Sequence, residues 1–209
     1  MRNIYLRSLS YYYKNKERGA DNMPDFWQGV EFSHMLFKEH INKGAIVVDA
    51  TVGNGHDTVF LAGLVGENGQ LLSFDIQKEA IENTRERLVN NKIIDRVQLI
   101  EDGHQNIDKY IDGEIDGIVF NLGYLPGGNK DITTEKKTTT SAVEKGLDFL
   151  KVGGIIILVI YTGHPGGQEE LRGVLDLTEC LNQQKYNVLR YNFINQGTSP
   201  QVLAIIRRK

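Results

Sequence analysis

Short runs of apolar, mostly β-branched residues alternate along the chain with stretches in which polar and apolar positions are mixed. The runs lie at residues 46–48, 71–74, 97–100, 115–120 and 155–160. After each of the first four comes a polar or turn-rich patch and then the spacing of an amphipathic helix. We expect helices that begin near His56, Lys78, Gln105, Thr134 and Gln168. This alternation predicts βαβ units around a parallel sheet that is covered on both faces.

The two ends of the chain depart from this alternation. Apolar positions between residues 26 and 41 predict a helix before the first strand. At the other end, one strand is expected from residue 186 to 195 and another over residues 201–208, with the short connection GTSP between them. Strands joined so closely must be antiparallel. The sequence therefore predicts an α/β fold whose mostly parallel sheet ends in an antiparallel C-terminal hairpin.

Composition places the chain among ordinary globular proteins. Its 209 residues include 24 Lys and Arg against 27 Asp and Glu, and 40% are hydrophobic. These values exclude a disordered, collagenous or coiled-coil chain, and the length favours one domain, over residues 25–209. Residues 1–24 form a basic extension with a net charge of +3. This extension is either an arm that contacts a polyanion or a partly ordered segment upstream of Met23 as the working initiator.

Cysteine and hydropathy narrow the chemistry further. Cys180 is the single cysteine, which excludes a disulfide within the chain. No Cys/His cluster has the spacing of metal ligands, so we expect no metal site. The longest apolar run, residues 155–160, is far too short to span a bilayer. A cytoplasmic protein is expected.

The segment VVDATVGNGHDT, residues 47–58, predicts a cofactor loop. A strand ends at Asp49, and Gly53 and Gly55 let the backbone turn tightly beside a ligand before a helix begins. A dinucleotide loop needs a third glycine where Thr58 stands, so pyrophosphate is not the favoured ligand. Asp75 follows 20 residues after Gly55, at the tip of the second strand, where an acid can accept both hydroxyls of a ribose. A simple tight turn and a helix cap are the structural alternatives.

Acidic residues also follow the third strand. Asp102 lies where an adenine edge would be if Asp75 holds the ribose, and it either accepts from the exocyclic amine or caps the next helix. Acids at three successive strand ends resemble the S-adenosylmethionine site of class I methyltransferases. The resemblance implies their Rossmann-like, seven-stranded sheet with the last strand antiparallel. It implies cofactor contacts from Asp49, Thr51, Gly53, Asn54, Gly55, Asp57, Thr58, Asp75, Gln77, Asp102, His104 and Asn121.

The fourth strand ends in FNLGYLPGGNK, residues 120–130, which is similar to the N-P-P-Y motif of amino-group methyltransferases. Leu122 and Gly123 stand where that motif has its two prolines. In such enzymes the Asn side chain accepts a hydrogen bond from the target amine and the aromatic ring stacks on the base. The resemblance gives these roles to Asn121 and Tyr124. A plain Gly/Pro turn after a strand is the alternative.

The fifth strand is followed by YTGHPGGQEE, residues 161–170. Its glycines and proline are expected to bring Tyr161 and His164 to the carboxyl edge of the sheet, where open α/β sheets bind ligands. Either residue is then a candidate to relay a proton. A single loop histidine is otherwise a surface residue.

DATVGNGHDT, NLGYLPGG, YTGHPGG and INQ together resemble one family of small bacterial class I methyltransferases labelled rRNA methylases. Its characterised members methylate the amine of 5-aminomethyluridine at the tRNA wobble position. The resemblance implies S-adenosylmethionine as donor, S-adenosylhomocysteine as product and a tRNA anticodon stem-loop as partner. A homodimer is expected as well, because a small enzyme that holds an anticodon stem commonly dimerises to widen its surface. Substrate contacts are expected from Leu125, Pro126, Gly127 and Gly128. A tRNA enzyme should also show a basic rim around the Asn121 loop, for which the candidates are Lys130, Lys136 and Lys137.

The chain departs from the family pattern at Asn129, at Thr162 and near Gly197, which leaves substrate contacts there open. Two rival functions also stay open. One is an rRNA or small-molecule methyltransferase of the same fold, which the acidic body of the chain favours. The other is a non-catalytic module that binds S-adenosylmethionine, because fold alone does not define function.

Overall fold

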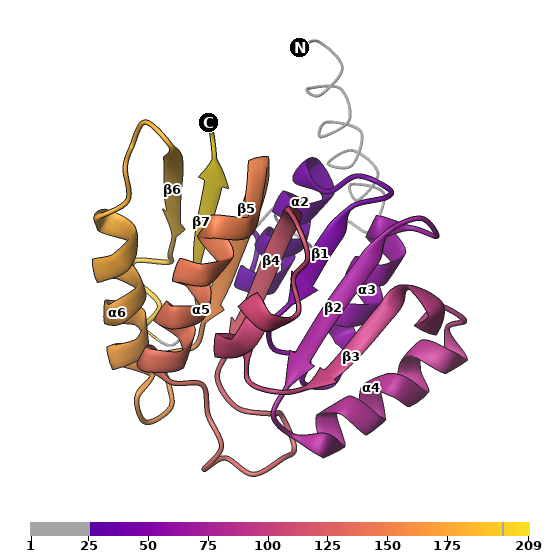
Figure 1. Cartoon of the computed structure of the whole chain (residues 1–209). Helices are drawn as coiled ribbons and strands as arrows, with labels where there is room; N and C mark the ends of the chain where they lie inside the picture. Colours follow the sequence, from indigo (N-terminus) through magenta and orange to yellow (C-terminus); the bar gives the residue numbers. More distant parts are fainter. Residues whose placement is uncertain (1–25, 198) are drawn as a thin grey trace, which may run out of the picture.

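Seven strands form a single sheet in the order β3-β2-β1-β4-β5-β7-β6 (Figure 1). The structure is a computed structural model that describes residues 26–197 and 199–209. The strands are β1 (Ile46–Asp49), β2 (Gln70–Asp75), β3 (Val97–Glu101), β4 (Ile115–Leu122), β5 (Leu150–Ile160), β6 (Tyr186–Tyr191) and β7 (Gln201–Arg207). Strands β1 to β5 pair in parallel, and β7 is antiparallel to both β5 and β6. The predicted fold class is confirmed.

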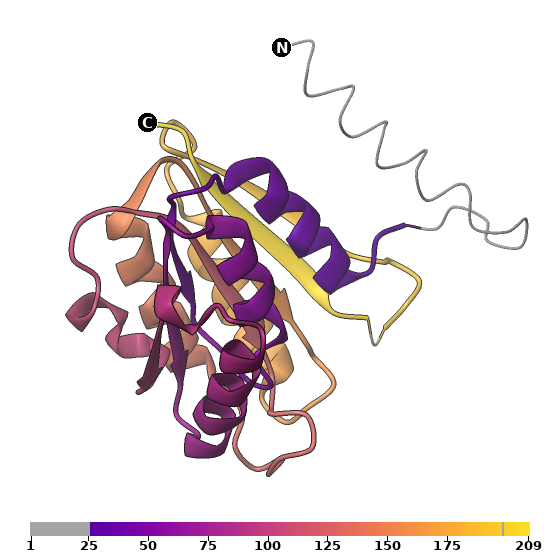
Figure 2. The ribbon, with the colours of Figure 1, turned by 90° about the vertical axis from the view of Figure 1, so that its right-hand side faces the viewer.

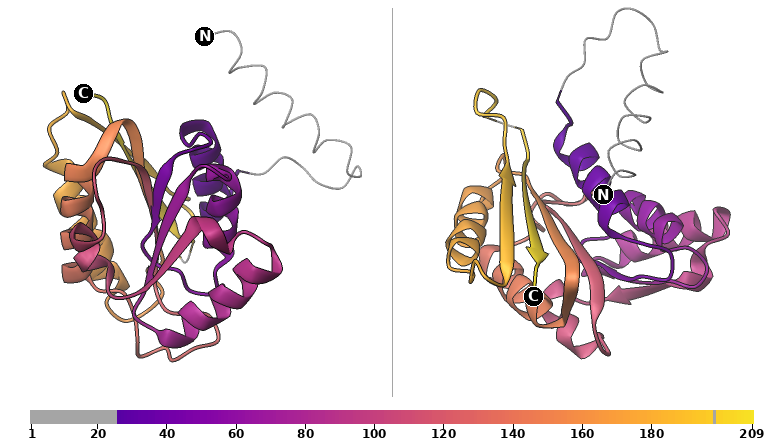
Figure 3. Two further views of the ribbon diagram at one scale, coloured as in Figure 1. Left: turned by 45° about the vertical axis from the view of Figure 1, so that its right-hand side comes forward. Right: turned by 90° about the horizontal axis from the view of Figure 1, so that it is seen from above.

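Helices cover both faces of the sheet. On one face lie α2 (Gly29–His40), α3 (His56–Val65) and α4 (Lys78–Asn90), and on the other α5 (Lys136–Phe149) and α6 (Gly167–Glu179). Two 3-10 turns, η1 (Ile94–Arg96) and η2 (His104–Lys109), flank β3. Seen from above, the sheet lies between the two helical layers (Figure 3), and α2 runs beside the yellow C-terminal strand (Figure 2).

Two apolar cores result from this layering. Val47, Ile157 and Val159 face the core that contains Phe37 of α2. Their neighbours along the strands, such as Val48, face the core beneath α5 and α6. Because successive strand residues point to opposite faces, a strand covered on both sides needs a continuous apolar run. This explains why the central strands were recognisable from the sequence.

Three sequence predictions need correction. The helix expected near Gln105 is the short 3-10 turn η2, whose N-cap residue is Gly103; the Asp102 side chain accepts from the Gly103 amide and from Asn106 Nδ2. The helix expected over residues 26–41 begins at Gly29. Strand β6 ends at Tyr191, because the chain turns where the Gln196 amide bonds the Phe193 carbonyl oxygen, and the connection to β7 is longer than predicted. The expected basic extension, residues 1–24, lies outside the described residues.

The sheet order positions a ligand site. The chain winds outward from β1 through β2 to β3, then returns to the other side of β1 to form β4 and β5. At such a reversal the connections leave β1 and β4 in opposite directions, and a crevice opens at their carboxyl ends. The loop between β4 and α5, residues 123–135, hangs from this edge, at the bottom of Figure 1. No helix within the described residues is long and apolar enough to cross a membrane.

Candidate active site

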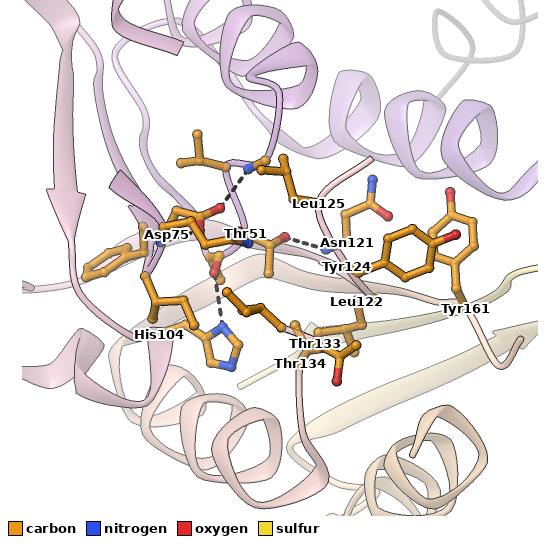
Figure 4. A pocket seen from close by; sticks show the side chains of 18 of the residues that line it. Thr51, Asp75, His104, Asn121, Leu122, Tyr124, Leu125, Thr133, Thr134 and Tyr161 are labelled. Atoms are coloured by element: carbon orange, nitrogen blue, oxygen red, sulfur yellow. Dashed lines mark hydrogen bonds between the residues drawn. The ribbon is translucent and has the colours of Figure 1, made fainter. Parts of the chain in front are cut away.

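A cavity of about 730 Å³ lies at the carboxyl ends of the central strands (Figure 4). This volume is in the range of small-molecule sites, roughly 300–1,000 Å³. The predicted site residues that line it are Thr51, Gly53, Asn54, Asp57, Asp75, Gln77, Asp102, His104, Asn121, Tyr124, Leu125, Pro126, Tyr161 and His164. Those outside its lining are Asp49, Gly55, Thr58, Gly127, Gly128, Lys130, Lys136 and Lys137. The topology therefore brings together all of the predicted catalytic residues and most of the predicted cofactor residues.

The side chains that line the cavity include several acids. Its lining contains four carboxylates, those of Asp57, Asp75, Asp102 and Glu135, and no lysine or arginine among the described residues. Such a wall attracts a cation and repels a phosphate. The described residues contain no group of three or more acidic, histidine or cysteine side chains that could hold a metal ion. The acidic lining therefore favours a positively charged ligand.

Asp49 is the last residue of β1 and supports the loop that follows it, residues 50–55, which we call the glycine loop. Its side chain is fully buried, accepting from the Thr58 hydroxyl at 2.6 Å and from the Thr51 amide at 3.2 Å. Burial raises the pKa of Asp49 to about 7, and the negative charge of Asp57 adds to this rise. Asp49 and Thr58, two of the expected cofactor contacts, lie outside the lining of the cavity and bond each other.

Glycine is required at positions 53 and 55 of the loop on different structural grounds. Gly53 lines the cavity in a left-handed conformation with φ of 52°. Gly55 lies outside the lining, and a Cβ atom there would come within 2.5 Å of the Thr84 hydroxyl on α4. Its φ of 76° also disfavours any residue with a side chain. Gly55 therefore serves the backbone turn and helix packing, and Gly53 the approach to a ligand.

Asp75 ends β2 at the cavity. Its carboxylate accepts from the Gly53 amide and from the Gln77 amide, both at 2.9 Å. Burial raises the pKa of Asp75, and these backbone bonds oppose the rise. Each carboxylate oxygen can accept more than one bond, so Asp75 fixes the glycine loop and still offers acceptors to a ligand.

Asp102 and His104 line the cavity where the chain leaves β3. Figure 4 shows His104 on the left. Asp102 accepts from the Asn106 side chain and the Tyr110 hydroxyl, both at 2.9 Å, which lowers its pKa. Burial lowers the pKa of His104, so its imidazole is neutral. Its Nδ1 bonds the Ala50 carbonyl oxygen at 3.1 Å, and a carbonyl only accepts, so Nε2 carries a lone pair. That buried Nε2 has no partner among the described residues.

Asn121 stands at the end of β4 with both its backbone and its side chain fixed. Its backbone amide donates to the Thr51 hydroxyl at 2.7 Å, and its Nδ2 donates to Asp57 Oδ2 at 3.2 Å. The other oxygen of Asp57 bonds His34 Nε2 at 2.7 Å. The hydrogen bonds of Asp57 with Asn121 and with His34 were not expected from the sequence. His34 belongs to α2, which is far along the chain from the predicted motifs. The only hint in the sequence was a histidine in the helix expected before the first strand.

Three further predicted side chains gather near Asn121. Figure 4 shows Tyr124 and Tyr161 on the same side of the cavity as Asn121. His164 is buried and packs edge-to-face on Tyr124, with ring centres 6.5 Å apart. Its Nδ1 bonds the Pro165 carbonyl oxygen at 2.9 Å, and its buried Nε2 has no partner among the described residues. Burial and the charge of Asp57 raise the pKa of Tyr161, which keeps its hydroxyl protonated.

The loop of residues 123–135 is anchored at both ends. The Thr134 amide donates to the Gly123 carbonyl oxygen at 2.9 Å, and Asn54 Nδ2 donates to the Pro126 carbonyl oxygen at 3.1 Å. Thr134 also donates to Glu170, a fully buried carboxylate of α6 that the sequence analysis did not single out. Burial raises the pKa of Glu170, although its hydrogen bonds from two threonine hydroxyls oppose this. The loop is therefore held against both the glycine loop and α6.

Sheet order, site position and a cation-compatible cavity define a class I S-adenosylmethionine-dependent methyltransferase. The family described as "Putative rRNA methylase" matches residues 71–207. The chain belongs to this rRNA methylase family, which confirms the resemblance noted from its motifs.

Relatives with solved structures agree in fold over most of the chain. A protein from Clostridium thermocellum described as a "putative rRNA-methylase" is 46% identical with a TM-score of 0.86, covering 88% of this chain and 100% of that one. A protein from Streptococcus mutans described as a "putative methyltransferase", solved in complex with SAH, is 38% identical with a TM-score of 0.80, covering 88% of this chain and 99% of that one. The architecture is thus shared along the whole length of both relatives.

Curated relatives act on RNA. The chain is 36% identical over 192 residues to the chloroplastic tRNA (mnm(5)s(2)U34)-methyltransferase of Arabidopsis thaliana, covering 87% of this chain and 70% of the relative. It is also 32% identical over 103 residues to the ribosomal RNA small subunit methyltransferase H of Oceanobacillus iheyensis. That match covers 44% of this chain and 31% of the relative, so the chain spans about a third of its length.

Proposed function

We propose that the chain methylates the primary amine of 5-aminomethyluridine at the wobble position of tRNA. The observation that carries the proposal is the Asn121 side chain, whose nitrogen bonds Asp57 and whose oxygen is left to accept a hydrogen bond from an amine. The likeness to the Arabidopsis thaliana tRNA methyltransferase supports the choice of acceptor. We further propose that the enzyme works in the cytoplasm as a homodimer, because a second copy would widen the surface that holds an anticodon stem.

The donor fits the cavity by charge and by hydrogen bonding. Asp75 would hold the ribose hydroxyls, the Gly53 loop would face the methionine end, and Asp102 and His104 would face the adenine. S-adenosylmethionine supplies an electrophilic methyl group on a positively charged sulfur. The acidic wall favours that charge, and its lining contains no lysine or arginine among the described residues.

We propose that the residues around Asn121 deprotonate and orient the acceptor amine. An alkylamine has a pKa near that of lysine, roughly 10, so it must lose a proton before its lone pair can react. We assign His164 as the residue that relays that proton, because its ring lines the cavity and packs against Tyr124. Tyr161 keeps its proton and offers a hydrogen-bond donor. Asn121 Oδ1 would then hold one remaining N–H, which directs the lone pair toward the methyl group.

Basic side chains border the cavity without lining it. The Lys130 ammonium lies 5.7 Å from the centre of the Tyr124 ring. Lys136 and Lys137 occupy the first turn of α5, where positive charge is unfavourable for the helix dipole. A position that costs the helix stability is consistent with a role in binding phosphate. We propose that these three lysines hold the RNA backbone and that the base displaces Lys130 to stack on Tyr124.

Steady-state kinetics on undermodified tRNA, with nucleoside mass spectrometry of the product, tests the proposal. Asn121→Ala should lower kcat by about 100-fold or more with little change in tRNA affinity, because it removes a fixed polar contact at the reacting centre. Full kcat in Asn121→Ala would refute the role of this loop. Ribosomal RNA is included as a competing acceptor, given the partial likeness to the small subunit methyltransferase. Preferential methylation of ribosomal RNA or of a free metabolite would refute the tRNA assignment.

The lysines are tested separately by salt dependence. Lys136→Ala and Lys137→Ala should raise KM for tRNA and flatten its dependence on salt, while kcat stays near that of the wild type. Lys151→Ala, at the opposite end of the sheet where Lys151 pairs with Asp116, is the matched control. An unchanged KM in both variants would remove α5 from the RNA-binding surface.

A further inference from the structure

Side chains from three separate elements form a continuous hydrogen-bonded chain behind the acceptor side of the cavity. His34 of α2 bonds Asp57 Oδ1 at 2.7 Å, and Asp57 Oδ2 of α3 accepts from Asn121 Nδ2 of β4 at 3.2 Å. The side chains of His34 and Asp57 are 27% and 12% exposed, so the chain is largely shielded from water. Each carboxylate oxygen of Asp57 is thereby directed to a different partner.

This arrangement decides which end of the Asn121 amide faces the acceptor. A carboxylate oxygen accepts hydrogen bonds and cannot donate, so the amide nitrogen must be the atom on the Asp57 side. Oδ1 is then the free end, and in Figure 4 it lies on the side of Asn121 toward Tyr161. A flipped amide would present N–H groups to the acceptor and would bind the lone pair that has to attack. The orientation of one amide is therefore critical for amine methylation.

His34 holds Asp57 in place. Its imidazole stacks on the Phe60 ring of α3, with centres 3.9 Å apart and planes within 11°. Nε2 of the fixed ring bonds one carboxylate oxygen, which leaves the other directed at Asn121. Asp57 also lies in the first turn of α3, where the helix dipole favours negative charge. Hydrogen bonds in such a series polarise one another, which strengthens the free amide oxygen as an acceptor.

We propose that Asp57 and His34 are positioning residues for methyl transfer: they lock the Asn121 amide with its oxygen toward the acceptor and so select acceptors that donate an N–H. This inference rests on the proposed amine methylation. It adds the hydrogen bonds that fix the Asn121 amide and so determine which acceptors can bind. Asp57 then acts through Asn121 rather than by contact with the donor. Sequence analysis had placed Asp57 among the cofactor contacts, and the hydrogen bonds of its two oxygens argue for the positioning role.

The orientation of the amide can be tested without any acceptor. The probe is solvent exchange of the Asn121 side-chain NH₂ protons, measured by NMR on protein labelled with ¹⁵N-asparagine and assigned by the signal lost in Asn121→Ala. In Asp57→Leu exchange should accelerate by about tenfold or more, as expected when a hydrogen bond to a charged group is lost. Asp116→Asn is the matched control, since Asp116 is a half-buried carboxylate at the opposite end of β4. An unchanged exchange rate in Asp57→Leu would overturn the proposal.

Kinetics on undermodified tRNA tests the catalytic consequence. Asp57→Leu should lower kcat by about tenfold to a hundredfold, with the affinity for S-adenosylhomocysteine and the KM for tRNA within about twofold of the wild type. Asp57→Asn keeps an acceptor oxygen and should recover part of kcat, which also covers the case in which Asp57→Leu does not fold. Asp57→Leu combined with Asn121→Ala should be no slower than Asn121→Ala alone, because both changes remove the same contact.

The outcomes separate this proposal from the proposed function. Losses that multiply in the double variant, or a fall in S-adenosylhomocysteine affinity large enough to explain the lower rate, would overturn the positioning role. His34→Gln should lower kcat less than Asp57→Leu does, and His40→Gln on the same helix is its control; equal rates in the two histidine variants would remove His34 from the positioning role. If wild-type protein does not methylate tRNA, the proposed function fails, and the exchange measurement still decides whether Asp57 orients Asn121.

Discussion

Replacing Asp49 by asparagine isolates the energetic cost of the carboxylate buried beneath the glycine loop. Burial, together with the charge of Asp57, raises the pKa of Asp49 from 3.8 to about 7. The folded chain thus holds this proton more tightly than the unfolded chain, so stability is lost as pH rises from about 4 to about 7. At about 1.4 kcal/mol for each pKa unit, the ionised carboxylate lowers the free energy of unfolding by about 4 kcal/mol above pH 7. About 2 to 3 kcal/mol of this loss develops between pH 5 and pH 8.

In Asp49→Asn the side chain no longer titrates, and its size and shape stay nearly the same. Its oxygen can still accept from the Thr58 hydroxyl, whereas its NH₂ group faces the Thr51 amide and loses that bond. The lost bond should cost about 1 kcal/mol at every pH. We therefore expect Asp49→Asn to have nearly wild-type stability at pH 5 and to be more stable than the wild type at pH 8.

The assay is urea denaturation of both proteins at pH 5 and pH 8, without donor. All other titrating groups are common to the two proteins, so the difference between them reports Asp49. This difference should move by about 2 to 3 kcal/mol in favour of the variant between the two pH values. Asp116→Asn serves as a control for loss of a carboxylate elsewhere in the sheet. A difference for Asp49→Asn that is constant to within about 0.5 kcal/mol would refute the reasoning.

Other substitutions test single contacts. Asp75→Ala should weaken S-adenosylhomocysteine binding by about 1.5–3 kcal/mol in calorimetry, and unchanged affinity would exclude Asp75 from the cofactor site. Glu170→Ala should lower the free energy of urea unfolding by about 2–4 kcal/mol, since the hydroxyls of Thr134 and of the buried Thr139 lose their acceptor; a loss below about 1 kcal/mol would contradict this. Gly55→Ala should cost about 1–3 kcal/mol in the same assay, and Thr84→Ala should restore part of it by removing the hydroxyl 2.5 Å from the new Cβ.

The fold was largely determined by local patterns that survive in the sequence. A parallel strand covered on both faces must be apolar at successive positions, so the central strands appeared as short runs such as residues 155–160. Parallel strands also direct their carboxyl ends to one edge, which is why acids and glycines after different strands could be assigned to one site. Asp75, Asn121 and His164 do line one cavity.

What the sequence could not decide were contacts between elements that are distant along the chain. His34 and Asn121 are linked through Asp57 only because α2 packs on the same face as α3, and no spacing rule connects a helix before the first strand with the end of the fourth. Glu170 likewise becomes a loop anchor only where α6 meets α5. Lys136 and Lys137, which were expected to contact the substrate, lie in the first turn of α5 and outside the lining of the cavity. Backbone direction follows from local hydrophobic pattern, whereas the partner of a polar side chain depends on three-dimensional packing.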